Sequence, residues 1–335
     1  MVAVVAIHLA ARIPQGDALY GVGRYIDHLC RFGVPLFLAA AGLRLAEKAP
    51  EVGDWPAWLH KRMRAVLPAY LLWAVLYGLV APLDGQGQAL LAGELPWPAR
   101  LLSVLFGYGA EQLYFMTAYL GLLLLAPLVG MVLQKLGPAA IGALAVLLAA
   151  MGLLALNGWL FAQCAALVQA HAPLRGVAGW LLQTEARTPL HWFGFYFCGV
   201  ALGQMRVSGL VWPPFVRWMA WPALVAHGWL ALRPPSLQFD DFWCSPALVL
   251  SSCTFALWGP PLARRIQDGR VGRGMQGLGR ASLAVYLSHV LFVRLAWMIV
   301  QRWPMPLALG LTATVTAFGV IAYLPVHRRV FGGAG

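Results

Sequence analysis

Residues 111–133 read EQLYFMTAYLGLLLLAPLVGMVL, and no charged side chain follows Glu111 until Lys135. The hydrocarbon core of a bilayer is about 30 Å thick, and an α-helix needs about 20 mostly apolar residues to cross it. This stretch therefore predicts a transmembrane helix. Its apolar run is continuous, whereas a strand of a membrane barrel alternates between apolar and polar residues.

Similar stretches recur along the whole chain. Hydrophobic residues make up 61% of the 335 positions and charged residues 11%. A soluble domain carries about 25% charged residues, so this chain lacks the polar surface needed to face water. The sequence predicts an all-α, polytopic integral membrane protein with about ten transmembrane helices, forming a single domain over residues 1–335. The predicted spans lie near residues 1–11, 27–46, 63–82, 111–133, 138–161, 189–205, 212–231, 242–262, 278–300 and 305–325.

The distribution of charge predicts the orientation of these helices. With the N-terminus in the cytoplasm, most Lys and Arg residues fall in the gaps that face the cytoplasm, and most Asp and Glu residues fall outside. The positive-inside rule therefore favours an N-in, C-in topology. The net charge of +12 is then a consequence of topology, and we expect no nucleic-acid partner.

The first predicted span is short. Eleven residues at about 1.5 Å each reach about 16 Å, roughly half of the hydrocarbon core. We expect either a half-span or a protein whose native start lies upstream of Met1.

Two ionisable residues are predicted in the outer half of the membrane. Charged groups inside spans are costly, so each is a hypothesis for a functional site. His8 lies four residues before Arg12, where the chain leaves the first span, and Glu111 opens the fourth span at a similar depth. The alternatives are a histidine hydrogen-bonded to a neighbouring helix and an ordinary interfacial carboxylate.

A basic cluster marks the cytoplasmic end of the third span, where Lys61, Arg62 and Arg64 precede Pro68 and Tyr70. Lys and Arg side chains at the end of a span often only place their charged groups in the water at the membrane surface. Guanidinium groups also bind phosphates with two parallel hydrogen bonds.

The ninth span carries a polar stripe. Ser282, Tyr286 and His289 are spaced i, i+4 and i+7, so they share one face of a helix, and Arg294 follows within the span. The stripe can join helices through hydrogen bonds or line a substrate channel. We expect Arg294 to need a carboxylate partner or a wet cavity.

The five cysteines are scattered and form no C-x-x-C pair. Buried free thiols are therefore expected, rather than disulfides or a metal site.

Several segments together resemble the acyltransferase 3 family of integral-membrane O-acyltransferases. The segment FGVPLFLAAAG (32–42) resembles the family's G-V-P-L-F-F-x-x-S-G, with Ala41 in place of Ser. Arg64 to Tyr70 is similar to R-x-x-x-P-x-Y, and Phe195 to Gly199 to Y-F-x-x-G. Residues 112–115, followed by 122–127, resemble H-L-W-F…L-L-L-P, with Gln112 and Tyr114 departing from it. Leu278 to His289 is similar to L-G-x-x-S-x-x-x-Y-L-x-H and is the nearest of these matches.

This resemblance implies transfer of an acyl group, expected to be acetyl, from cytoplasmic acetyl-CoA across the bacterial inner (cytoplasmic) membrane. The acceptor would be a hydroxyl of an extracytoplasmic glycan or lipid-linked saccharide, and no metal is implied. His8 would be the general base, because an imidazole with an unperturbed pKa of about 6.5 can take and return a proton near neutrality; an acyl-His intermediate is the alternative. Glu111 would orient His8 or hold the acceptor. The remaining implied roles are donor binding by Lys61, Arg62 and Arg64, and a channel or acceptor site formed by Tyr114, Ser282, Tyr286, His289 and Arg294.

Two further expectations accompany this interpretation. The family places a basic residue one span-length before the histidine of its first span. Here that position would precede Met1, so we expect an upstream start that supplies it. The rival hypotheses are a secondary transporter, in which His8, Glu111, His289 and Arg294 form a proton or anion pathway, and a structural membrane protein.

Overall fold

A computed structural model describes residues 1–48, 52–80, 101, 104–136, 189–209 and 269–331, together with isolated positions between 159 and 252. Within these ranges all regular structure is helical, as the sequence predicts. The elements are α1 (Val2–Ala10), α2 (Tyr20–Cys30), α3 (Gly33–Glu47), η1 (Val52–Asp54), α4 (Trp55–Val80), α7 (Leu113–Leu136), α10 (Pro189–Val207), α14 (Arg270–Arg280), α15 (Ser282–Val300) and α16 (Met305–Phe331).

Four helical stretches are long and apolar enough to cross a membrane: Tyr20–Glu47, Leu113–Lys135, Ser282–Val300 and Met305–Phe331. Helices α4 and α10 also fall on predicted spans. The predicted spans at 138–161, 212–231 and 242–262 lie outside the described residues. The number of about ten spans therefore remains a prediction.

The second helical stretch begins earlier than the sequence predicts, at Tyr20 rather than near residue 27. A turn at Asp17 supports this earlier start. The Asp17 side chain accepts a hydrogen bond from the backbone N–H of Leu19 at 2.8 Å, and its carbonyl oxygen accepts one from Tyr20 at 3.0 Å. Side-chain oxygens that accept backbone N–H groups in this way favour the start of a helix.

Helices α3 and α10 pack with their backbones in close contact. A Cβ atom added at Gly199 would meet the carbonyl group of Ala39, and one added at Gly42 would meet the carbonyl group of Tyr196. Gly199 and Gly203 form a G-x-x-x-G pattern on α10. Small residues at this spacing allow helix backbones to approach closely in membranes.

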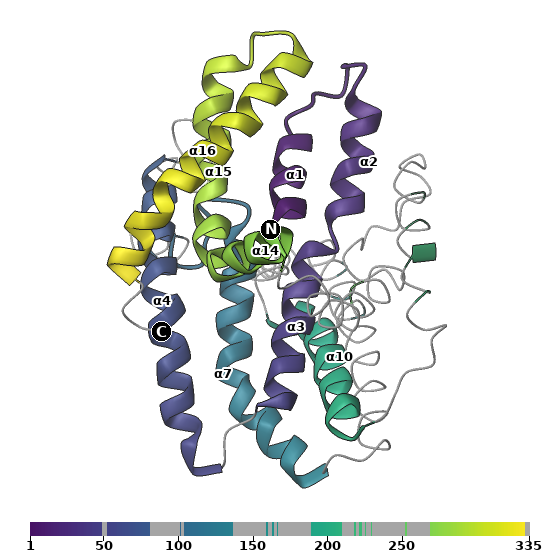
Figure 1. The fold of residues 1–335 in the computed structure, drawn as a ribbon, viewed down its shortest axis with the longest axis vertical. Helices are drawn as coiled ribbons and strands as arrows, with labels where there is room; N and C mark the ends of the chain where they lie inside the picture. Colours follow the sequence, from purple (N-terminus) through teal and green to yellow (C-terminus); the bar gives the residue numbers. More distant parts are fainter. Residues whose placement is uncertain are drawn as a thin grey trace.

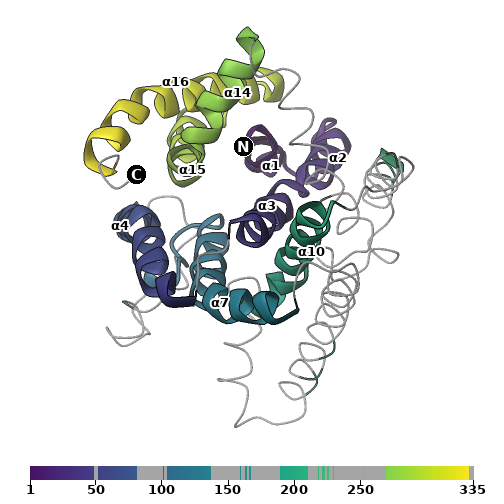
Figure 2. The same cartoon turned by 60° about the horizontal axis from the view of Figure 1, so that its bottom comes forward.

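Helix α15 packs against α16, α1, α4 and α14. Figure 1 shows α15 beside α16 and α1, with α14 lying across the bundle, while Figure 2 shows α4, α7, α3 and α10 in an arc on the other side. One buried core extends through α1, α3, α4, α7, α10 and α15. The candidate site lies where α1, α4 and α15 meet the N-terminal end of α7.

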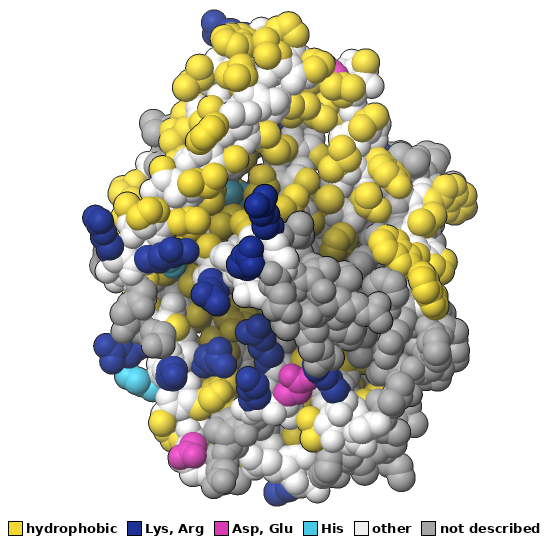
Figure 3. Space-filling view, in the orientation of Figure 1, with side chains coloured by type: hydrophobic (Ala, Val, Ile, Leu, Met, Phe, Trp, Pro, Cys, Tyr) yellow, Lys and Arg dark blue, Asp and Glu magenta, His cyan; other side chains and the backbone are white. Residues whose placement is uncertain are grey.

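The face seen in Figure 3 divides into two regions. Hydrophobic side chains predominate at the end formed by the α15–α16 and α1–α2 turns, whereas most Lys and Arg side chains gather across the middle and the opposite half. An apolar band beside a basic one is the pattern expected where a bilayer meets the cytoplasm.

Candidate active site

His8 lies on α1 and faces a carboxylate. Its Nδ1 atom is 3.7 Å from Oε2 of Glu111, and its side chain is 12% exposed, compared with 61% for Glu111. Glu111 occupies the turn immediately before α7, where the free N–H groups of a helix N-terminus favour a negative charge. The structure thus brings His8 and Glu111, which are 103 positions apart in the printed sequence, to one place.

His289 on α15 also lies beside His8. The two imidazole rings are 5.1 Å apart between centroids and tilted by 53°. His289 is fully buried, and its Nδ1 atom lies 3.0 Å from the carbonyl oxygen of Val285 and 2.8 Å from that of Tyr286. Because carbonyl oxygens only accept hydrogen bonds, Nδ1 carries the proton, and Nε2 is left as an acceptor. Among the described residues, this buried Nε2 atom has no hydrogen-bond partner.

Tyr286 connects the histidine pair to the start of α7. Its hydroxyl donates a hydrogen bond to the backbone carbonyl of Gln112, the residue after Glu111. Its ring lies 6.0 Å from that of His289 and packs edge-to-face against Phe115 at 5.1 Å. Tyr286 is therefore part of the site, with its hydroxyl committed to the backbone.

Arg294 lies about a turn and a half beyond His289 and is 3% exposed. Its Nη1 atom donates to the carbonyl oxygen of Gly109 at 3.3 Å, and its guanidinium group lies 5.9 Å from the ring centre of Tyr77. Two of its neighbours are thus a backbone carbonyl in the turn that carries Glu111 and the face of an aromatic ring. The predicted carboxylate partner or wet cavity stays a prediction.

A series of aromatic rings runs from the histidine pair toward the basic region. Phe115, which packs on Tyr286, stacks on Tyr119 with centroids 6.0 Å apart and planes 13° apart. The charges of Arg62 on α4 and Arg44 on α3 both act on Tyr119. The series links Tyr119 to His289 through ring contacts, and the two cations lie near enough to Tyr119 for their charges to act on it.

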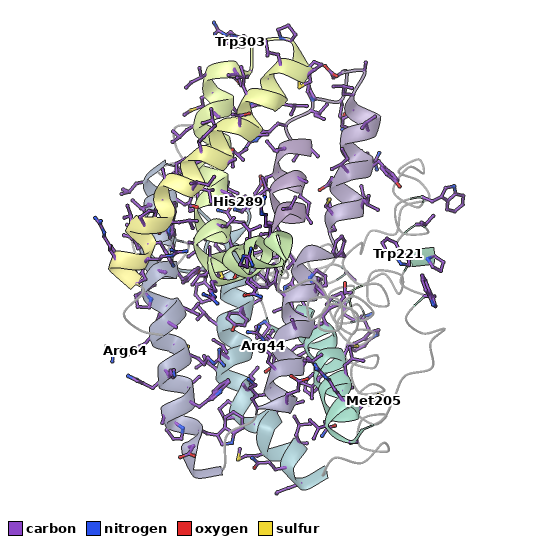
Figure 4. All side chains as sticks on the ribbon, viewed as in Figure 1. Arg44, Arg64, Met205, Trp221, His289 and Trp303 are labelled. Atoms are coloured by element: carbon purple, nitrogen blue, oxygen red, sulfur yellow. The ribbon has the colours of Figure 1, made fainter. Side chains whose placement is uncertain are left out.

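The three residues of the predicted basic cluster are exposed, and Arg62 differs from the others in its contacts. The Arg62 guanidinium lies 5.5 Å from the ring centre of Trp58, and it is near enough to Tyr119 for its charge to act on the phenol. Arg64 is exposed and points away from the bundle, whereas His289 lies within it; Arg44 on α3 is exposed as well (Figure 4). Lys61 is exposed.

Two other predicted residues lie apart from the histidine pair. Ser282 is the first residue of α15, about two turns before His289. Tyr114 stacks on Trp192 of α10 at 5.7 Å, with planes 16° apart. Within the described ranges, no group of three or more His, Cys, Asp or Glu side chains is arranged to hold a metal ion.

Tyr77 and Arg44 belong to this region but were not predicted from the sequence. Tyr77 has a visible signal, because a tyrosine hydroxyl in an apolar span needs a hydrogen-bond partner. Arg44 has a weaker one, since a basic residue at the cytoplasmic end of a span is common. Only the packing of α3 against its neighbours directs it toward Tyr119.

A comparison with protein-family models matches residues 1–324 to the model described as an acyltransferase domain (Acyl_transf_3). Comparisons with curated proteins and with solved structures found no match.

Proposed function

We propose that this chain, which belongs to the acyltransferase 3 family and is an integral membrane acyltransferase, transfers acetyl groups. The proposed acceptor is a hydroxyl of an extracytoplasmic glycan or lipid-linked saccharide. The donor is cytoplasmic acetyl-CoA, and the membrane is the bacterial inner membrane. The observation that carries the proposal is the His8–Glu111 pair beside a second buried histidine.

In the proposed reaction, His8 is the general base. Glu111 accepts a hydrogen bond from Nδ1–H of His8 and so leaves Nε2 free to take a proton. The present Nδ1–Oε2 separation of 3.7 Å would shorten when substrates bind, as catalytic hydrogen bonds often do. Nε2 removes the proton of the acceptor hydroxyl while the hydroxyl oxygen attacks the thioester carbonyl carbon. The C–S bond then breaks, and the leaving thiolate of coenzyme A takes up the proton.

We place the phosphates of the donor at Arg62, with Arg44 as a second cation. Both charges act on Tyr119, which begins the aromatic series leading to His289. The pantetheine arm of coenzyme A is long and flexible. Aromatic rings can contact such an arm through their flat faces, without hydrogen-bonding groups placed to match it. Arg64 points away from the bundle, so we assign it to the interface with the bilayer (Figure 4).

Purified protein in lipid nanodiscs provides the test. Acetyl-CoA labelled in its acetyl group is supplied with a model saccharide, and both release of the coenzyme A thiol and transfer of label are measured. We expect both. Label that stays on the protein without an acceptor would assign an acyl-His intermediate instead of general-base catalysis. An absence of thiol release would refute the proposal and favour the transporter hypothesis.

The donor site has a matched pair of variants. Arg62→Ala is expected to raise the KM for acetyl-CoA about three- to tenfold, because charge-assisted hydrogen bonds to phosphate are lost. Arg64→Ala removes the same charge from the same helix and should change the KM by less than about twofold. Equal effects of the two substitutions on the KM would mean that acetyl-CoA binding depends only on the total positive charge of this part of α4.

A further inference from the structure

The hydroxyl group of Tyr77 is hydrogen-bonded to two backbone groups of one turn of α15. Tyr77 lies on α4 and is fully buried, and its hydroxyl donates to the carbonyl oxygen of Leu287 at 2.8 Å. The same hydroxyl accepts the backbone N–H of Leu291 at 2.9 Å. In an α-helix these two backbone groups are bonding partners, since they are four residues apart. A side chain from another helix is therefore bonded to both partners of one backbone pair in the turn that carries His289.

The turn before His289 is unusually rich in such bonds. Ser288 Oγ donates to the carbonyl of Ala284 at 2.8 Å, and His289 Nδ1 lies within hydrogen-bond distance of the carbonyls of Val285 and Tyr286. With Leu287 and Tyr77, four consecutive carbonyl groups take a side-chain donor. Side chains that insert into the ladder bend helices. Of these donors Tyr77 comes from outside α15, so α4 fixes the geometry of this turn.

Tyr77 also supports the turn that carries Glu111. The ring of Tyr77 lies beneath the guanidinium of Arg294, which donates to the carbonyl of Gly109. The backbone at Gly109 rests directly on α4, since a Cβ atom there would lie 2.8 Å from the Gly78 nitrogen and 2.9 Å from the Tyr77 carbonyl carbon. Glu111 follows Gly109 by two residues.

We propose that Tyr77 is a positioning residue, which aligns His289 and Glu111 beside His8. The inference rests on the proposed acyl transfer. The Tyr77 hydroxyl bonds the turn that carries His289, and its ring contacts Arg294, which holds the turn of Glu111; the ring also packs on Trp73 at 5.5 Å. The role assigned to Tyr77 involves no contact with substrate. Positioning of this kind has large kinetic effects, because a misplacement of about 1 Å can cost about 10²-fold in rate.

The test is Tyr77→Phe, which keeps the ring beneath Arg294 and removes only the hydroxyl. We expect kcat to fall by about ten- to a hundredfold. The KM for acetyl-CoA should stay within about twofold, because Arg62 and Arg44 are unchanged. The matched control is Tyr323→Phe, which removes a hydroxyl that accepts a hydrogen bond from Trp73 of α4 at 2.9 Å. Because Trp73 packs on the ring of Tyr77 at 5.5 Å, this control disturbs the surroundings of Tyr77 without removing the hydroxyl that bonds α15. A kcat of Tyr77→Phe within twofold of the wild type, or an equal loss in the control, overturns the inference.

Two further measurements separate positioning from a general loss of stability. If Tyr77 acts through His289, the double variant Tyr77→Phe/His289→Gln should be no slower than His289→Gln alone, whereas independent effects would multiply. Amide hydrogen exchange in residues 287–291 should accelerate in Tyr77→Phe while exchange elsewhere stays the same. If the wild-type protein transfers no acyl group, the proposed function fails. Unchanged exchange in this turn would separately show that Tyr77 does not hold α15.

Discussion

At the scale of single residues, the activity depends on whether His8 moves a proton. A general base contributes about 10²–10⁴-fold to a rate, so His8→Ala should lose at least this much acyl transfer. His8→Gln keeps a hydrogen-bonding side chain of similar reach but cannot take and return a proton, and we expect it to be equally inactive. The measurement is transfer of labelled acetyl by equal amounts of inserted protein.

The contrasting variant is Glu111→Gln. Its amide can still contact His8 but carries no charge, so we expect a smaller loss, about ten- to a hundredfold. A structural histidine would give the reverse pattern. His8→Gln would then be tolerated, and the defect of His8→Ala would appear as poor expression rather than as a lower rate.

Sequence reasoning identified most residues at the centre of this region but not their mutual arrangement. The cost of ionisable groups within a membrane singles out His8, His289 and Arg294 from the sequence alone. That cost gives no information on which of these residues contact one another in the folded protein. Contact between His8 and His289 depends on α1 packing beside α15, and Tyr77 gains its role from a bond to backbone, which side-chain patterns do not encode.

At the scale of helices, the contact between α3 and α10 gives a second test. Gly199→Ala would place a methyl group against the backbone carbonyl of Ala39. A flexible side chain could relieve such a clash by changing its rotamer, but the backbone cannot. The helices must separate, at a cost of about 1–3 kcal/mol. We expect a lower melting temperature for the purified protein and no specific change in the KM for acetyl-CoA.

The control for this substitution is Gly310→Ala on α16, where an added Cβ atom would meet nothing within 4 Å. Alanine is the better helix former by about 1 kcal/mol, so this variant should be neutral or slightly more stable. Equal melting temperatures for the two variants would mean that α3 and α10 are not in backbone contact in the membrane.

The helices themselves were easier to predict than their ends. Hydrophobic runs locate α7, α15 and α16 because the bilayer requires their length. The start of α2 was missed because residues 20–26 are not an apolar run, and the turn at Asp17 that precedes the helix depends on hydrogen bonds to the backbone of Leu19 and Tyr20. The sequence also predicts one span over 278–300, whereas the structure ends α14 at Arg280 and begins α15 at Ser282. The polar, glycine-rich composition of α14 accounts for this break, because such a helix has little apolar surface to bury along α15.

At the scale of the whole molecule, the arrangement of the helix ends bears on topology. The α1–α2 and α15–α16 turns lie together at one end, while Met1 and the end of α16 both lie away from it (Figure 1). With the basic side chains gathered away from that end (Figure 3), the positive-inside rule favours termini that are both cytoplasmic. The proposed reaction needs this orientation, because acetyl-CoA reaches Arg62 from the cytoplasm.

Reporter fusions decide the orientation. Green fluorescent protein fused after Gly335 should fluoresce, and alkaline phosphatase fused there should be inactive, because the first folds in the cytoplasm and the second requires an oxidising compartment. Alkaline phosphatase fused after Trp303, in the α15–α16 turn, should be active, since the chain has by then crossed to the outer side. The two positions are separated by α16 alone among the described helices, so opposite results at them also show that α16 spans the bilayer. Active alkaline phosphatase after Gly335 would mean that the topology is opposite to the predicted one. Arg62 would then face the outside, and cytoplasmic acetyl-CoA could not reach its proposed site.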